Sequence, residues 1–170
     1  TLNATRRQRQ MCIRDRAATA SLELADPVRR RFESARLTQP LADSLPRKRE
    51  LMESVIEVYT NAADYGVADV TTAATYRLGE VYEQFSVDLM ESDRPRDLAA
   101  DALEQYEILL EEQAFPFEEK AIELFTTNAD RAAGGVYDEW VKKSFQRLAS
   151  LMPGRYAKEE RSEDVVTALN

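Results

Sequence analysis

The chain has 170 residues, of which 44% are apolar and 32% are charged, and its formal net charge is -8. This size and composition are ordinary for one helix-rich domain or a few stacked repeats, and the negative charge argues against a nucleic-acid or anionic-membrane surface. The chain has no histidine, which removes the commonest general base, the Ser-His and Cys-His nucleophile pairs and every histidine-containing metal site.

The sequence predicts no membrane-spanning segment, because it contains no run of about 18 apolar residues. No secretory signal is visible either. Since the chain begins at Thr1 and not at a methionine, we expect it to be a fragment or a processed product. Its single cysteine, Cys12, has no partner for an internal disulfide and therefore does not indicate a redox compartment.

Residues 1–16 differ from the rest of the chain, because they carry five arginines and one aspartate, a local charge of +4. Such a segment is typical of a disordered basic arm, and an electrostatic docking arm is the alternative. A third interpretation is a resemblance. Residues 11–16, Met-Cys-Ile-Arg-Asp-Arg, resemble translated sequencing-adapter read-through, which implies that residues 1–16 are not native.

Residues 17–44 are predicted to form short helices followed by a linker. Asp26 and Pro27 make a good cap and first-turn pair, so they are expected to open a second helix. Two prolines between positions 38 and 46 indicate the linker.

Residues 45–155 form the predicted repeat domain. Apolar residues at helical spacing predict a helix over 46–65, which Gly66 ends. A central helix follows, which Asp69 is expected to cap and which runs to about Ser92.

Gly79 lies inside the apolar face of this central helix. Glycine in a helix interior costs about 1 kcal/mol relative to alanine, so its presence needs a physical reason. We predict that a second helix crosses the central one at Gly79, where only a hydrogen fits.

Three further helices are expected. The first ends at Phe115, because the residue before a proline is pushed out of the helical region. Pro116 starts the next helix, which the glycine pair at 134–135 ends. The last helix stops at Pro153, and residues 156–170 are predicted to be a polar tail.

No segment shows strand alternation, and six or so helices with short connections indicate antiparallel neighbours. Leu78-Gly79-x-x-Tyr82 resembles the core of helix A of a tetratricopeptide repeat, and Ala121-x-x-x-Phe125 resembles part of a later helix B. The resemblance covers about residues 45–150. It implies an all-α fold in which antiparallel helical hairpins stack as a short TPR-like α-solenoid.

A narrower resemblance concerns the run from Tyr106 to Leu124, followed by Tyr137-Asp-Glu-Trp-Val-Lys-Lys-Ser144. These residues resemble the C-terminal part of exported tetratricopeptide proteins of Gram-negative bacteria. The resemblance implies a periplasmic or cell-envelope scaffold that binds protein partners and no nucleic acid. A cytoplasmic regulatory adaptor of the same fold is the alternative.

Acidic residues cluster on the two helices around Pro116, and a carboxylate-dependent all-α enzyme is therefore a further alternative. Helical carboxylate metal sites usually add a histidine, which this chain lacks. We therefore expect a solvated acidic face and no catalytic residue, metal or cofactor. The residues concerned are Glu104, Glu107, Glu111, Glu112, Glu118, Glu119 and Glu123.

The candidate partner-binding residues follow from the tetratricopeptide resemblance, which implies that one face of the central helix lines a groove. That face carries Tyr76, Glu80, Glu83 and Gln84. The alternative for Tyr76 is packing against a neighbouring helix, and Trp140 is expected in a contact between helices.

Overall fold

The computed structural model describes residues 2–157, with side chains from residue 10 onward. Within this part of the chain the fold is all-α, without a strand, as the sequence predicts. The elements are α1 (Leu2–Ser34), α2 (Leu41–Asp64), α3 (Ala68–Met90), α4 (Ala100–Asp130), the 3-10 turn η1 (Arg131–Gly134), α5 (Glu139–Leu151) and α6 (Pro153–Tyr156). None of the described helices is both long enough and apolar enough to cross a membrane.

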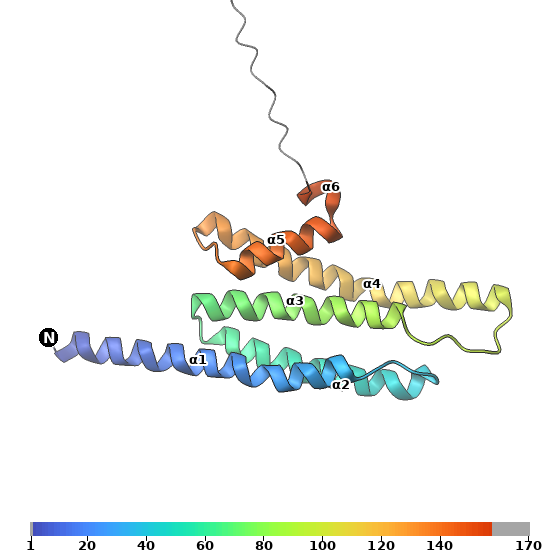
Figure 1. Cartoon of the computed structure of the whole chain (residues 1–170), viewed down its shortest axis with the longest axis horizontal. Helices are drawn as coiled ribbons and strands as arrows, with labels where there is room; N and C mark the ends of the chain where they lie inside the picture. Colours follow the sequence, from blue (N-terminus) through green and yellow to red (C-terminus); the bar gives the residue numbers. More distant parts are fainter. Residues whose placement is uncertain (1, 158–170) are drawn as a thin grey trace, which may run out of the picture.

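Neighbouring long helices run antiparallel and lie side by side (Figure 1). Each of the helices α1 to α4 packs against the helix that follows it, and α3 also touches α1 and α5. The central helix α3 is therefore the element that joins the α1–α2 pair to the α4–α5 pair. This arrangement is consistent with a helical, solenoid-like fold.

Helix α1 corrects two predictions. Residues 2–16, which were expected to be disordered, are helical, and Pro27 lies inside the helix instead of opening a new one. A proline removes one backbone hydrogen bond, but packing on both sides of it holds the helix together. Ala18 is buried with residues of α2 and α3, and Phe32 is buried in the main core.

Helix α2 begins earlier than predicted. It starts at Leu41 and not at residue 46, so Pro46 lies inside the helix. The predicted linker is therefore too long.

The connection between α2 and α3, in contrast, follows the prediction closely. Gly66 ends α2 with a left-handed φ of +63°, and its N–H donates to the carbonyl of Ala63 at 2.9 Å. Helix α3 begins at Ala68, so Asp69 lies in its first turn and is not the cap. The helix ends at Met90, close to the predicted end.

Helix α4 continues through Pro116, so the predicted break there is wrong. Buried contacts lie on both sides of the proline, because Ala114 and Phe117 both pack into the core that α3 shares. The Phe117 ring lies 4.5 Å from that of Phe85 on α3. In Figure 1 the helix changes direction in its middle part, and proline is the usual cause of such a bend.

The C-terminal helices agree with the sequence. Gly135 adopts a left-handed φ of +84° after η1, and the Asp138 side chain caps α5 by accepting from the N–H groups of Trp140 and Val141. A single turn, α6, follows at Pro153. The predicted tail from residue 158 onward lies outside the described residues.

The predicted helix crossing at Gly79 is confirmed. Gly79 is buried, and a Cβ atom built on it would lie 2.5 Å from Cε1 of Phe125 on α4. Carbon atoms cannot approach that closely, so a side chain here would displace the Phe125 ring or one of the helices. The absence of a side chain at Gly79 therefore sets the close packing of α3 on α4.

Candidate functional site

The four residues predicted to face a groove are divided by the structure. Glu80, Glu83 and Gln84 line a hollow of about 150 Å³ between α1, α3 and α5. Tyr76 does not line this hollow, because its side chain is buried between α3, α4 and α5 and is only 7% exposed. The predicted role of Tyr76 as an exposed anchor is therefore wrong, whereas the other three residues do share one surface.

Tyr76 is covered because two aromatic rings reach it. The small residue at Gly79 lets Phe125 approach α3, and helix α5 brings Trp140 over the same ring. The ring centroids lie 5.6 Å and 5.5 Å from that of Tyr76, respectively. Burial, together with the charge of the nearby Glu80, raises the pKa of Tyr76 to about 12. Trp140 thus lies in a contact between helices, as expected.

The hollow on α3 is called the α3 groove here, and its walls carry ion pairs. Arg147 of α5 donates from Nε to Oε2 of Glu83 at 3.0 Å, and this hydrogen bond raises the pKa of the Arg147 guanidinium. Glu80 pairs with Arg77 at 2.7 Å. Gln84 is exposed and donates to Asp88 at 2.9 Å. These contacts fix the wall of the groove that α3 supplies.

The opposite wall of the α3 groove comes from α1. Arg29 and Glu33 form an ion pair there. Phe32 also lines the groove but is buried, so the exposed apolar surface of the groove comes from Val87 of α3. Counting both walls, three carboxylates and two guanidinium groups line the groove, and each carboxylate already has an arginine partner, one of which, Arg77, lies outside the lining. The groove has room for one long side chain, and a cationic end on that chain would share these carboxylates with their arginines.

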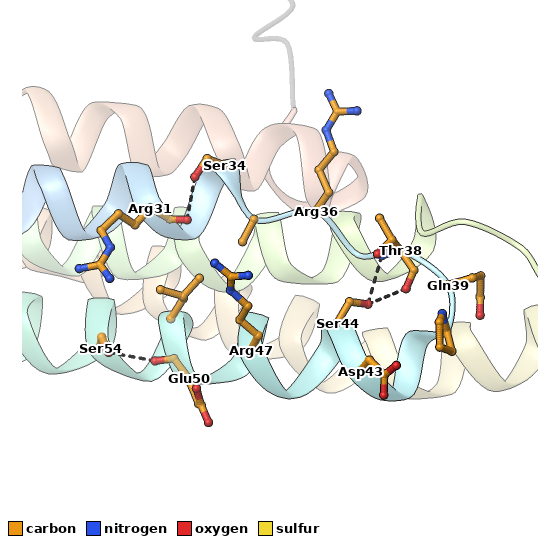
Figure 2. Close-up of a pocket in the computed structure, with 13 residues that line it drawn as sticks. Arg31, Ser34, Arg36, Thr38, Gln39, Asp43, Ser44, Arg47, Glu50 and Ser54 are labelled. Carbon is orange, nitrogen blue, oxygen red and sulfur yellow. Dashed lines mark hydrogen bonds between the residues drawn. The ribbon is translucent and has the colours of Figure 1, made fainter.

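A second and larger hollow, called the hairpin pocket here, lies where α1 turns into α2. Its volume is about 900 Å³, and Figure 2 shows its lining residues. Three arginines line it, accompanied by hydroxyl side chains of the connecting loop and the adjacent helix ends. The most relevant lining residues are Arg31, Ser34, Arg36, Thr38, Ser44 and Arg47.

A buried lysine holds the walls of the hairpin pocket in place. Lys48 is 1% exposed, and its Nζ donates to the carbonyls of Phe32 and Ala35 at 2.7 Å each. The same Nζ lies 2.6 Å from Oδ2 of Asp88 on α3 and 4.1 Å from the centre of the Phe32 ring. Lys48 therefore ties the end of α1 to both α2 and α3.

The loop of the hairpin is anchored separately. Gln39 donates from Nε2 to the carbonyl of Asp93 at 2.6 Å and to the hydroxyl of Tyr106 at 3.1 Å. Tyr106 belongs to α4, so the hairpin pocket lies beside the N-terminal half of that helix. The predicted acidic face of α4 is exposed there, and Glu107 has one cationic neighbour, Arg94, at 3.5 Å.

The sequence predictions did not include the hairpin pocket, although the chain carries a signal for it. Two basic triplets, Arg29-Arg30-Arg31 and Arg47-Lys48-Arg49, are separated by 15 residues. Their spacing across the predicted linker could have placed them on one hairpin. The basic segment that the sequence predictions considered was residues 1–16, at the opposite end of α1.

Comparison with protein-family models, with curated proteins and with solved structures gives no match to this chain. Among the described residues, no group of three or more acidic, cysteine or histidine side chains is placed to hold a metal ion. The chemistry of the α3 groove and of the hairpin pocket is therefore the basis for assigning a function.

Proposed function

We propose that this chain is a non-catalytic, TPR-like scaffold for protein–protein interaction, and that its α3 groove holds a basic segment of a partner protein. The observation that carries the proposal is the lining of the groove, in which three carboxylates surround an apolar surface between α1, α3 and α5. These three helices alternate in the chain with α2 and α4. In helical solenoids, such alternate helices form one extended binding face.

The chemistry of the α3 groove supports a lysine or an arginine as the anchoring side chain of the partner. Such a side chain packs its aliphatic stem on apolar surface and keeps its charged end near carboxylates. Val87, which is 39% exposed, supplies the apolar surface, and Glu80 and Glu83 supply the carboxylates. Because Glu80 and Glu83 are each already paired with an arginine, we expect the charges to determine partner choice more than affinity.

A selection from a library of random displayed peptides tests this proposal. Peptides enriched on the wild-type chain should contain lysine or arginine. The variant Gln84→Arg places a positive charge on the groove wall. It should lower the affinity for these peptides by about tenfold or more, since like charges at an interface are costly.

The matched control is Gln113→Arg, the same change at an exposed residue of α4 away from the groove. It should leave peptide binding within about twofold of wild type, because exposed charges contribute little at a distance. Two results would reject the groove as the binding site. One is equal peptide affinity of the two variants, and the other is an enriched set of peptides without basic residues.

We also propose a periplasmic or cell-envelope location, which rests on the resemblance of residues 106–124 to exported tetratricopeptide proteins. Fractionation of a Gram-negative cell that expresses the full-length gene tests this location. Recovery in the periplasmic or envelope fraction supports it. Recovery in the cytoplasmic fraction would favour the cytoplasmic regulatory adaptor instead.

A further inference from the structure

The hairpin pocket gathers three arginines from one short stretch of the chain. Arg31, Arg36 and Arg47 take part in none of the ion pairs found among the described side chains. Four other arginines do pair with carboxylates, namely Arg29, Arg77, Arg94 and Arg147. The exposed Arg30 and Arg49 beside the pocket take part in none of these ion pairs. The pocket therefore gathers positive charge that the described carboxylates do not neutralise.

Two of these arginines extend into the space between α1 and α2. Figure 2 shows Arg31 on α1 and Arg47 on α2, both directed into the space between the two helices, whereas Arg36 points away. Two acidic residues, Asp43 and Glu50, also line the pocket. In the same view the carboxylate of Glu50 is directed away from α1, and Asp43 lies in the first turn of α2. The lining therefore has three arginines against two carboxylates, and Arg31 and Arg47 supply the positive charge directed into the space between the helices.

The walls that carry Arg31 and Arg47 are held by interactions outside the pocket. Lys48 ties the end of α1 to α2 and α3, and Gln39 ties the loop to α4. Like charges that converge on a fixed hollow repel one another, and an anion between them removes that repulsion. A site whose walls are fixed before binding also loses less entropy when its ligand arrives.

We propose that the hairpin pocket binds a phosphate monoester, with Arg31 and Arg47 as its two main ligands. The planar guanidinium group matches phosphate oxygens with two parallel hydrogen bonds, which makes arginine well suited to phosphate recognition. Residues 29–49 carry seven basic and two acidic side chains, a local charge of +5 in a chain of net charge -8. This local excess attracts an anion despite the overall charge.

The neighbourhood of the pocket favours a small phosphate group over a nucleic acid. Residues 97–119 carry eight acidic side chains and no lysine or arginine, and this segment lies beside the hairpin through the contact of Gln39 with Tyr106. A long polyanion would extend over this acidic surface and be repelled by it. A single phosphate group stays within the pocket, where screening over about 8 Å at physiological salt weakens the repulsion.

Calorimetric titration of the full chain tests the proposal in about 0.15 M salt, where diffuse electrostatic attraction is largely screened. The probes are glycerol 3-phosphate, a short peptide with one phosphoserine, and a single-stranded oligonucleotide. The first two probes distinguish a free small molecule from a phosphorylated protein as the source of the group. Binding of either one supports a phosphate-monoester site.

The variants Arg31→Gln and Arg47→Gln should each lower the affinity for that probe by about tenfold or more, because each removes charge-assisted hydrogen bonds. Arg30→Gln and Arg49→Gln are matched controls, since they remove the same charge from exposed neighbours that do not line the pocket. These controls should change the affinity by less than about twofold.

Three results would overturn the proposal. One is that neither phosphate monoester binds at millimolar concentration. Another is an equal loss of affinity in all four variants, which would show diffuse attraction and not a site. The third is tighter binding of the oligonucleotide than of either monoester. Unchanged far-ultraviolet circular dichroism in each variant establishes that the fold is intact.

Discussion

Helix α3 is held on its two sides by different kinds of contact. On the α4 side, Gly79 lets the ring of Phe125 approach the α3 backbone, and the contact is apolar. On the α1–α2 side, the buried Lys48 reaches Asp88 and two backbone carbonyls, one at the end of α1 and one just after it. One contact depends on shape and the other on charge.

This difference teaches how each contact fails. An apolar close approach fails when volume is added, because the packed interior has no space to absorb it. A buried charge fails when its partner is removed, because the remaining group is left without compensation. Substitutions that break one contact at a time should therefore show how much each contact contributes to the free energy of unfolding. The largest loss of stability is expected where volume is added.

The variant Gly79→Leu should destabilise the chain the most, by about 3 kcal/mol or more, because the new side chain meets the Phe125 ring. Chemical denaturation measures this change. Gly134→Leu is the matched control, since a Cβ at Gly134 meets no atom within 4 Å. Equal destabilisation by both changes would show that Gly79 is not a site of close helix contact.

Replacing Lys48→Met should destabilise the chain by about 2 kcal/mol. The change keeps most of the apolar stem but leaves Asp88 and the carbonyls of Phe32 and Ala35 without their cation. The expected loss is below the range for a fully buried pair, because Asp88 is 22% exposed. Arg49→Met, at an exposed neighbour, should cost much less in the same denaturation experiment. A smaller loss at Lys48 than at Arg49 would contradict the role of the buried ion pair.

Tyr76 makes the α4 side sensitive to alkaline pH. Its pKa is about 12 in the folded chain, above the ordinary value of 10.0, so folding favours the protonated phenol. The stability that follows is present below pH 10 and is lost as the pH rises from 10 to 12, by about 1 kcal/mol at pH 11. Tyr76→Phe should lose less stability than wild type over this range. Identical pH curves for the two chains would contradict the burial of the phenol.

The cap of α5 should give the smallest effect. Asp138→Ala removes the acceptor for the N–H groups of Trp140 and Val141 and for the hydroxyl of Thr72. We expect a loss of about 1 kcal/mol in the free energy of unfolding. Asp138→Asn keeps an acceptor oxygen and should lose less, so a larger loss for the amide would argue against capping.

The contact at Gly79 was predictable from sequence because its signal is local. A glycine inside the apolar face of a helix carries a cost whatever residues surround it in sequence, so a close helix contact can be predicted from that position alone. The contact of Lys48 was not predictable in the same way. Its acceptors are two backbone carbonyls and one carboxylate from other helices, and nothing in the adjacent sequence indicates them.

The errors at Pro27 and Pro116 have a common cause. In both places a sound local rule for helix ends was overridden by buried contacts on each side of the proline. The candidate site shows the same limit. The spacing of Glu80, Glu83 and Gln84 correctly placed them on one face of α3. The burial of Tyr76 instead depends on where α4 and α5 pack, and the spacing of residues within α3 does not predict that.

The most direct test of the proposed scaffold function is to map a selected basic peptide on the isotope-labelled chain by its amide chemical shifts. We predict that the largest shift changes lie at residues 29–33, 80–87 and 147, which surround the α3 groove. Residues 100–115, on the exposed half of α4, should change little. Shift changes confined to that half of α4, with none around the groove, would contradict the assignment of the α3 groove as the partner-binding site.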